Sequence, residues 1–439
     1  MAMTRSSVGH IVLRLLPLQL LLRGWEAILP LLFAIWFGHS AQMDIYYFSF
    51  SLFTFVGSFI SYAYTDSVII PILTNLRCSE PQHLRQMIAS LFTYTLVLAV
   101  ALGLVIGLIA FGWFSLRYTL DSFSFAARMI LPLFLYLLFL SLKSFLIAVL
   151  NAEHHYVLPP LAGGFGTVVN LACLFLLKSG IGVLAIPIAS ALGELVALLV
   201  VMWAVAIYCN SPLFISFERP QAMIQFSKLA FFEVSGSTIT RINPVVDQLM
   251  ANLTMVVGGG ALLRYAGDVA LVPTSLLQAT LLPVLLSHLS EHVAHKDYHQ
   301  VKKMTYSSLS IVFVGLAVLS GVIYLMRIPL LRFLFLRGVM EGEGVDQMAQ
   351  LLGFFLLGLA PFGVMLVLAR VHSALQNSQL LFKAGFLSAL TNLLLDFLCV
   401  HQWGLKGVAL ATAGVYWVLA CFLGVALFLS FRQFPKSAQ

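Results

Sequence analysis

Charged side chains are scarce in this sequence. Lys, Arg, Asp and Glu together make up 9% of its 439 residues, whereas an ordinary soluble protein carries about 25%. The hydrophobic residues, counted as Ala, Val, Ile, Leu, Met, Phe, Trp, Tyr and Cys, reach 61%. So few charges cannot cover a soluble surface, which excludes a soluble enzyme, a nucleic-acid-binding domain and a disordered scaffold. The composition predicts a polytopic helical membrane protein.

Cysteine is also rare, and its few copies form no recognisable pattern. The chain has five cysteines, without a CxxC pair and without the Cys/His spacing of a metal site. We therefore expect neither a disulfide framework nor a bound metal. A cofactor is not expected either, on the separate ground that no covalent chemistry is indicated. The net charge of +7 is spread along the chain without a basic run. This pattern indicates loops that face anionic lipid, and it predicts no nucleic-acid partner.

Long apolar runs dominate what is present. A membrane-spanning helix needs about 20 mostly apolar residues. Twelve runs meet this requirement, near 11–37, 46–74, 87–113, 125–150, 156–177, 182–208, 222–256, 262–288, 305–326, 348–375, 379–402 and 405–431. The first run lacks a small-residue cleavage site, so we expect a span and not a cleavable signal peptide. The seventh run is too long for one straight helix and contains Pro244, where we expect a bend or break.

An even number of spans places both termini on one side of the membrane. If that side is the cytoplasm, the inner segments hold more Lys and Arg than the outer segments do, which favours cytoplasmic termini. The most charged loop, EHVAHKDYHQVKK at 291–303, is then cytoplasmic. The loops are short, so no separate catalytic domain is expected outside the membrane.

The two halves of the chain look alike. A glycine-rich turn precedes the last span of each half, GIGVLA at 180–185 and GLKGVALA at 404–411. Internal duplication is typical of transporters whose site lies between the repeats. We predict an all-α polytopic membrane protein with about twelve transmembrane helices in two six-helix lobes around a central cavity. The predicted lobes are 1–208 and 222–439, joined by a cytoplasmic linker at 209–221.

Several short motifs follow one another in a fixed order. They are GHSAQMDIYYF at 38–48, IIPIL at 69–73, RINPVVDQ at 241–248, YA at 265–266, LP at 282–283, FLFLRG at 333–338 and GLKGVALA at 404–411. In their order and spacing, over about 12–430, the chain resembles the MurJ/MviN lipid II flippases of the multidrug/oligosaccharidyl-lipid/polysaccharide exporter superfamily. The resemblance implies a flippase that moves a polyprenyl-diphosphate-linked saccharide from the inner to the outer leaflet of a bacterial inner membrane by alternating access.

The chain departs from that family at the cations that the resemblance would place around a pyrophosphate. The span-two position falls near Phe55 and Val56, without a cation, and the span-eight position is Gly267-Asp268, which is acidic. In span one, Arg23 is displaced by about one to two turns. The resemblance therefore leaves open whether the saccharide carrier is lipid II itself or a related cell-envelope or exopolysaccharide precursor.

Charges inside the predicted spans are the candidate binding groups, because a charge at bilayer depth costs at least about 2.5–3.5 kcal/mol. Arg23 and Glu26 share a helix face near the middle of span one. Arg241 lies in the seventh run beside the expected break, and its guanidinium could bind a diphosphate bidentately. With Asp247, these are the predicted substrate-binding residues; structural ion pairs are the alternative interpretation.

Three further carboxylates, Asp66, Glu233 and Asp268, are candidates for ion coupling, with H+ or Na+ as the ion. Asp268 could instead neutralise an arginine. Lys143 could extend to the membrane surface. Glu194, near the middle of span six, is expected to be a packing or coupling residue.

A monomeric flippase that binds a lipid-linked saccharide and membrane lipids is the function that these observations favour. An enzyme is not expected, because no acid/base groups converge along the sequence. Two alternatives stay open. The scattered carboxylates would suit an ion-coupled small-molecule or drug antiporter of the same superfamily, and the missing arginines would suit a transport-inactive relative.

Overall fold

The structure is a computed structural model, and it describes residues 28–60, 69, 73, 81–153, 155, 157–208, 215–217 and 239–433. Over these residues every regular element is a helix. The predicted all-α fold class is confirmed.

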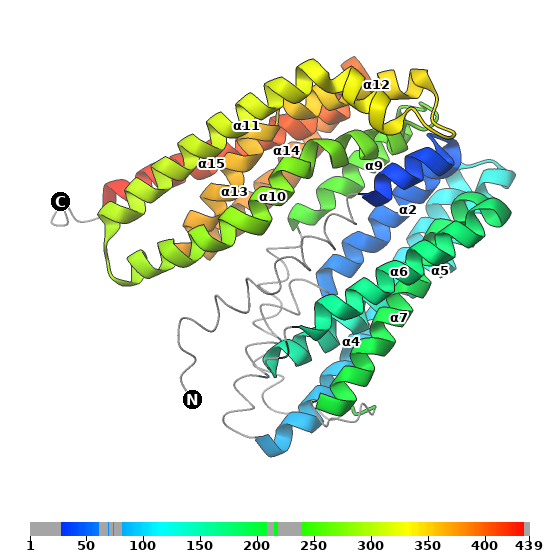
Figure 1. Ribbon diagram of the computed structural model, residues 1–439, viewed down its shortest axis with the longest axis horizontal. Coiled ribbons are helices and arrows are strands. Elements are labelled where there is room, and N and C mark those ends of the chain that lie inside the picture. Colours follow the sequence, from blue (N-terminus) through cyan, green and yellow to red (C-terminus); the bar gives the residue numbers. More distant parts are fainter. Residues whose placement is uncertain are drawn as a thin grey trace. The chain divides into compact units, whose positions relative to one another are not determined.

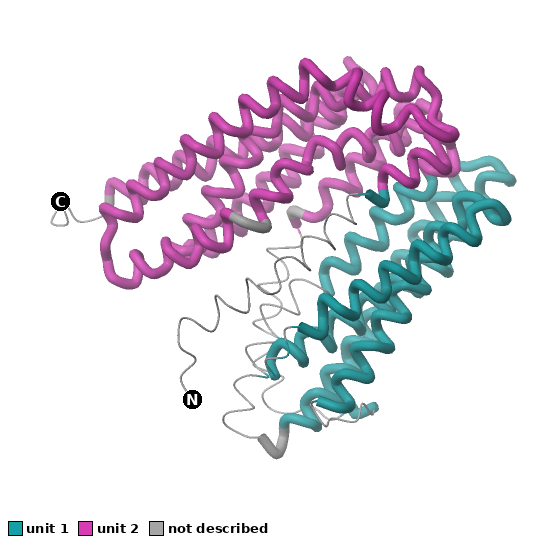
Figure 2. Tube along the Cα trace, viewed as in Figure 1, with its two compact units in different colours: residues 1–29, 45–238 teal, residues 30–44, 239–439 magenta. Residues whose placement is uncertain are grey.

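Two compact units make up the chain (Figure 2). Unit 1 comprises Met1–Leu29 and Ile45–Thr238, and unit 2 comprises Pro30–Asp44 and Ile239–Gln439. The predicted lobes are each continuous in sequence. The units are not, because the N-terminal segment Pro30–Asp44 packs with the C-terminal half of the chain. The division at 209–221 stays a prediction.

Unit 1 is a bundle of long helices (Figure 1). Its described helices are α4 (Pro81–Arg117), α5 (Leu120–Ala152), α6 (Leu158–Ile181) and α7 (Ala185–Tyr208), together with α2 (Ala41–Ser58) from Ile45 onward. Helices α4, α5 and α7 enclose a buried core that includes Leu91, Phe145 and Val201. Helix α6 folds back on α7 through a 3-10 turn at Gly182–Leu184, and Gly182 has a φ of +57°. Glycine adopts this left-handed conformation without steric cost.

Unit 2 contains most of a short helix at Ile28–Phe37, whose first two residues belong to unit 1. Seven further helices of unit 2 are described. These are α9 (Asn243–Leu253), α10 (Gly259–Ala294), α11 (Tyr298–Phe335), α12 (Gly342–Leu356), α13 (Leu359–Ala374), α14 (Ser378–Trp403) and α15 (Leu405–Gln433). Helix α13 packs against α10, α11 and α15, and α14 packs against α15.

The seventh apolar run changes conformation where a bend was expected. A 3-10 turn at Thr240–Ile242 precedes α9, and Pro244 occupies the first turn of α9. Proline fits this position because the first N–H groups of a helix have no intrahelical acceptor. The predicted break is confirmed on its C-terminal side, while 222–238 lies outside the described residues.

The tenth run was predicted as one span at 348–375, and the structure divides this run between two helices. Helices α12 and α13 are bent by 44° at Leu357–Gly358. Pro361 has no N–H to donate to the carbonyl of Leu357, and the indole nitrogen of Trp417 donates to that carbonyl instead, at 3.1 Å. A Cβ on Gly358 would lie 2.8 Å from Cα of Ala413, so α15 approaches the break closely.

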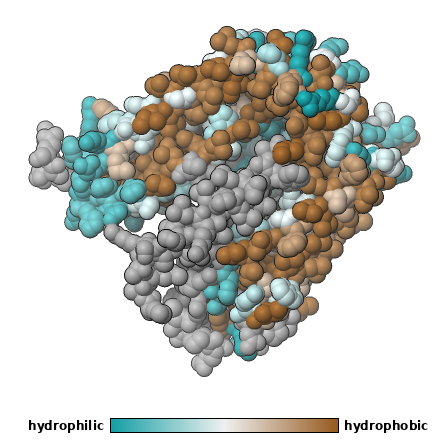
Figure 3. Space-filling model, viewed as in Figure 1, coloured by the Kyte–Doolittle hydropathy of each residue, from teal (hydrophilic) through white to brown (hydrophobic). Residues whose placement is uncertain are grey.

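Among the described residues, seven helical segments are long and apolar enough to cross a membrane, or eight if α12 and α13 form one broken span. One of the seven, Leu158–Tyr208, contains both α6 and α7. Hydrophobic side chains cover most of the visible described surface, and hydrophilic ones gather near the turn between α10 and α11 (Figure 3). The chain is a multi-span membrane protein.

Candidate functional site

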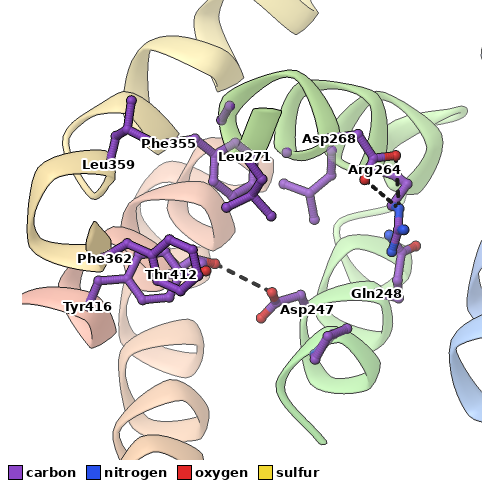
Figure 4. Close-up of a pocket in the computed structure, with 14 residues that line it drawn as sticks. Asp247, Gln248, Arg264, Asp268, Leu271, Phe355, Leu359, Phe362, Thr412 and Tyr416 are labelled. Atoms are coloured by element: carbon purple, nitrogen blue, oxygen red, sulfur yellow. Dashed lines mark hydrogen bonds and ion pairs between the residues drawn. The ribbon is translucent and has the colours of Figure 1, made fainter. Parts of the chain in front are cut away.

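A cavity of about 130 Å3 opens within unit 2. Side chains from α9, α10, α12, α13 and α15 line it (Figure 4). The lining residues are Pro244, Asp247, Gln248, Leu263, Arg264, Gly267, Asp268, Ala270, Leu271, Phe355, Leu359, Phe362, Thr412 and Tyr416. Convergence of five helices on one cavity with charged, aromatic and amide groups makes it the candidate site.

One wall of the cavity carries an ion pair from α10. The Nε of Arg264 donates a hydrogen bond to Oδ2 of Asp268 at 3.1 Å, and Figure 4 shows the two side chains pointing toward each other. The Arg264 side chain is 42% exposed and that of Asp268 is 25% exposed. Because a guanidinium stays protonated in proteins, it supplies a permanent positive charge at this wall.

Sequence analysis missed Arg264. The run predicted at 262–288 places Arg264 at the end of a span, where a charge has ready access to water. Helix α10 begins at Gly259, so Arg264 lies in its second turn. The spacing of four residues between Arg264 and Asp268 places both on one helix face and could have identified the pair.

The opposite wall of the cavity is aromatic. The rings of Phe362 and Tyr416 lie 4.4 Å apart at an interplanar angle of 34°, in a close tilted contact. Phe355 and the leucines Leu271 and Leu359 complete this apolar surface. The cavity therefore offers a charged face and an apolar face to the same ligand.

A buried polar cluster lies behind the wall that carries Asp247. The amide nitrogen of Asn392 donates to Oδ1 of Asp247 at 3.0 Å and to Oδ2 of Asp396 at 3.1 Å. The Thr412 hydroxyl donates to Oδ2 of Asp247 at 3.4 Å (Figure 4). Asp396 is fully buried and Asn392 is 1% exposed, and the Oδ1 atom of each has no hydrogen-bond partner. These oxygens form a set that could hold a proton or a small cation, because two adjacent buried carboxylates repel when both are ionised.

The turn before α10 fixes the position of Arg264. The carboxylate of Asp44, in the first turn of α2, accepts hydrogen bonds from the backbone N–H groups of Gly258 at 2.6 Å and Ala261 at 2.9 Å. It thereby satisfies N–H groups at the start of α10 that no helical carbonyl can reach. A Cβ on Gly258, whose φ is +76°, would lie 2.7 Å from the backbone of His39. Only glycine fits this turn.

Two of the predicted site residues, Asp247 and Asp268, line the same cavity. Arg241 is half-buried in the turn at Thr240–Ile242 and is not among the lining residues. The other predicted site residues lie outside the described residues: Arg23, Glu26, Asp66 and Glu233.

Unit 1 contains an ion pair of its own. Nζ of Lys143 on α5 lies 2.5 Å from Oε2 of Glu194 on α7, and the two side chains are only 14% and 20% exposed. The expectation that Lys143 extends to the membrane surface is wrong, because a carboxylate on the neighbouring helix neutralises it.

Comparison with known proteins identifies the family to which this chain is similar. The family model described as lipid II flippase MurJ matches residues 33–437. A probable lipid II flippase MurJ of Vibrio cholerae is 23% identical over 413 residues, which are 89% of this chain and 76% of that protein. The lipid II flippase MurJ of Thermosipho africanus is 28% identical over 168 residues, and the match spans 38% of this chain and about a third (34%) of that relative's length.

Solved structures support the fold. A lipid II flippase MurJ in an inward closed conformation superposes with a TM-score of 0.80 at 19% identity, covering 96% of this chain and 88% of that one. An inward-facing multidrug resistance transporter of the MATE family in the MOP superfamily superposes with a TM-score of 0.74 at 12% identity, covering 94% and 96%. At these identities the likeness concerns the fold alone. Because the family model matches nearly the whole chain, this protein belongs to the lipid II flippase MurJ family.

Proposed function

We propose that this protein translocates a polyprenyl-diphosphate-linked saccharide, lipid II or a related cell-envelope precursor, from the inner to the outer leaflet of a bacterial inner membrane by alternating access. The observation that carries the proposal is the partly exposed guanidinium of Arg264 in the wall of the cavity. The protein acts as a monomeric transporter with both termini in the cytoplasm. Alternating access makes and breaks no covalent bond, so the protein is not an enzyme.

Arg264 is the proposed diphosphate contact within unit 2. A guanidinium can donate two parallel hydrogen bonds to phosphate oxygens, which an ammonium group cannot do in the same way. Asp268 holds the guanidinium in place before the ligand arrives and offsets its charge. Arg23, with Glu26 beside it, and Arg241 are the further proposed contacts, because one arginine matches only part of the charge of a diphosphate.

Transport assays in liposomes test this assignment. Purified protein is reconstituted with a fluorescent polyprenyl-diphosphate disaccharide, and the lipid that reaches the other leaflet is measured by reductive quenching. We expect Arg264→Ala to slow translocation by about tenfold or more and Arg264→Lys to slow it less, since lysine keeps the charge but loses the bidentate geometry. Arg337→Ala is the matched control, because Arg337 is exposed on the turn after α11.

If Arg264→Ala translocates the lipid at the wild-type rate, Arg264 is not a diphosphate contact. Absence of translocation by the wild-type protein with every polyprenyl-diphosphate saccharide would overturn the proposed function itself.

The cluster of Asp247, Asn392, Asp396 and Thr412 is the proposed site of the coupling ion. Its oxygens come from α9, α14 and α15. Hard cations are bound in proteins by carboxylate, amide and hydroxyl oxygens, and Oδ1 of Asn392 and of Asp396 are two such oxygens without a hydrogen-bond donor. The proposed ion is Na+, with H+ as the alternative.

Thermal unfolding distinguishes these ions. A bound ion stabilises the folded protein by RT ln(1 + [ion]/Kd), so Na+ should raise the Tm relative to choline at equal ionic strength. We expect the rise to vanish in Asp396→Asn and to persist in Asp121→Asn, which alters an exposed carboxylate at the start of α5. An Na+ effect that survives in Asp396→Asn would place the ion elsewhere, and a Tm that responds to pH but not to Na+ would identify the ion as a proton.

A further inference from the structure

A second cavity, of about 780 Å3, opens in unit 2 where α15 begins. Three segments distant in sequence border it, namely the turn between α9 and α10, the first turns of α12, and the turn between α14 and α15. None of its lining residues lines the cavity of Arg264. Helix α15 begins beside this cavity at Leu405 and ends at Gln433, so the cavity and the C-terminal end of α15 lie at opposite ends of that helix. Its size is within the range of about 300–1,000 Å3 that is usual for small-molecule sites.

The bottom of this cavity is apolar and its edge is polar. Leu351 and Leu405 are buried, at 2% and 8% exposed, and both line the cavity. Glu343, Gln347 and Gln350 line it from α12. Their spacing of four and three residues puts them on one face of the helix. A set of polar planar groups on one helix face is unusual in a chain with 9% charged residues.

One carboxylate of this edge is held in a fixed orientation. Nη2 of Arg332, on α11, donates to both oxygens of Asp346, at 2.9 Å and 3.1 Å, and its Nε donates to one of them at 3.2 Å. The side-chain amide of Gln347 donates to Glu343 at 3.4 Å. Asp346 is thus oriented before any ligand binds, and orientation of a binding group in advance lowers the entropy lost on binding.

The other side of the cavity presents the indole of Trp403. This side chain is 51% exposed, directly before Gly404, whose φ of +56° lets the chain turn into α15. An exposed Trp at a membrane interface is common, because the ring suits the headgroup region. Interface preference does not explain why a glutamate, two glutamines and Lys406 line the same cavity as the ring.

We propose that this cavity binds a saccharide. The axial C–H groups of a pyranose form an apolar face that packs on an aromatic ring, here Trp403. Its hydroxyl groups both donate and accept hydrogen bonds, which matches the carboxylates and amides of α12. A neutral polyol also suits the charge of the cavity, because Glu343 disfavours an anion, Lys406 disfavours a cation, and Asp346 is neutralised by Arg332.

The identity of the saccharide rests on the proposed function. With both termini in the cytoplasm, the cavity faces the outer side, where the translocated carrier presents its sugar. The ligand is therefore the saccharide head group of the released substrate, and N,N′-diacetylchitobiose serves as a soluble, uncharged disaccharide probe.

Saturation-transfer NMR of the full-length protein in detergent micelles measures this binding. We expect the C–H protons of N,N′-diacetylchitobiose to receive saturation from the wild-type protein and binding to weaken about tenfold or more in Trp403→Ala. Trp403→Phe, which retains a ring, should bind between the two. Trp203→Ala is the control, because Trp203 is 60% exposed on α7 in unit 1 and does not line the cavity.

Equal binding by wild type and Trp403→Ala, with unchanged Tm in both, would overturn the site, and so would an absence of binding to the wild type. These results are distinguishable from failure of the proposed function. If the wild-type protein translocates the lipid in liposomes but does not bind the disaccharide, only the proposed saccharide site is refuted. If the protein binds the disaccharide through Trp403 but translocates no polyprenyl-diphosphate saccharide, the saccharide site is supported and the proposed transport function is refuted.

Discussion

Replacing Gly166 with Ala should separate α6 from α7. A Cβ built on Gly166 lies 2.7 Å from the carbonyl oxygen of Gly193 and 2.9 Å from Cβ of Ala197. Carbon atoms in contact prefer about 3.5–4.0 Å, so the helices must move apart by roughly 0.5–1 Å, and contacts along the interface lose a quarter to a half of their dispersion energy. Because backbone lies behind the clash, no side chain can rotate away, and we expect a cost of about 1–3 kcal/mol.

Gly163 is the matched control on the same helix. A Cβ on Gly163 has nothing within 4 Å, so Gly163→Ala should be neutral or stabilise α6 by up to about 1 kcal/mol through helix propensity. Thermal unfolding in detergent measures both variants. The Tm should fall by about 2–12 °C for Gly166→Ala, taking about 2–4 °C per kcal/mol. If the two variants unfold at the same temperature, the close approach of α6 and α7 is not real.

Three other substitutions test single contacts by the same unfolding measurement. Glu194→Ala should cost up to about 3–5 kcal/mol, because it leaves the mostly buried Lys143 without its carboxylate; replacing both residues by Met should recover most of the loss, and equal losses for single and double variants would contradict the pair. Asp44→Ala should cost about 1–3 kcal/mol, since two backbone N–H groups at the start of α10 lose their acceptor, whereas a neutral result would mean that water replaces the carboxylate. Trp417→Phe should cost about 0.5–1.5 kcal/mol by removing the hydrogen bond to the carbonyl of Leu357, and no change would show that this carbonyl needs no donor.

The helices were predictable where an apolar run ends at a residue that stops a helix. The runs 379–402 and 405–431 correspond to α14, Ser378–Trp403, and α15, Leu405–Gln433. Gly404, with a φ of +56°, separates them. The break between α12 and α13 was not predicted, because hydropathy does not register a lost hydrogen bond. Pro361 removes a donor from an otherwise apolar run, and the compensating donor, Trp417, comes from another helix.

The candidate site was predictable only in part, for a related reason. Asp247 and Asp268 were recognised as carboxylates inside predicted spans, since the cost of a buried charge is a local property. The partners of Asp247 are distant in sequence. Asn392 lies 145 residues away and Thr412 lies 165 residues away. A single sequence contains no signal that joins an uncharged amide or hydroxyl to a carboxylate at that separation.

The charges of the described helices suggest how ion binding and the cavity are connected. Lys143 pairs with Glu194, and Arg264 pairs with Asp268, so each of these charges is offset by a neighbouring side chain.

Asp247 and Asp396 differ, because these two carboxylates lie beside each other and accept hydrogen bonds from the amide of Asn392 and the hydroxyl of Thr412. A proton or cation placed between them would remove their repulsion and tie α9 to α14 and α15. Asp247 also lines the cavity of Arg264. Binding of the ion would therefore fix one wall of the cavity in which the diphosphate is proposed to bind, and loss of the ion would free α9, beside its proline-containing first turn, to move that wall.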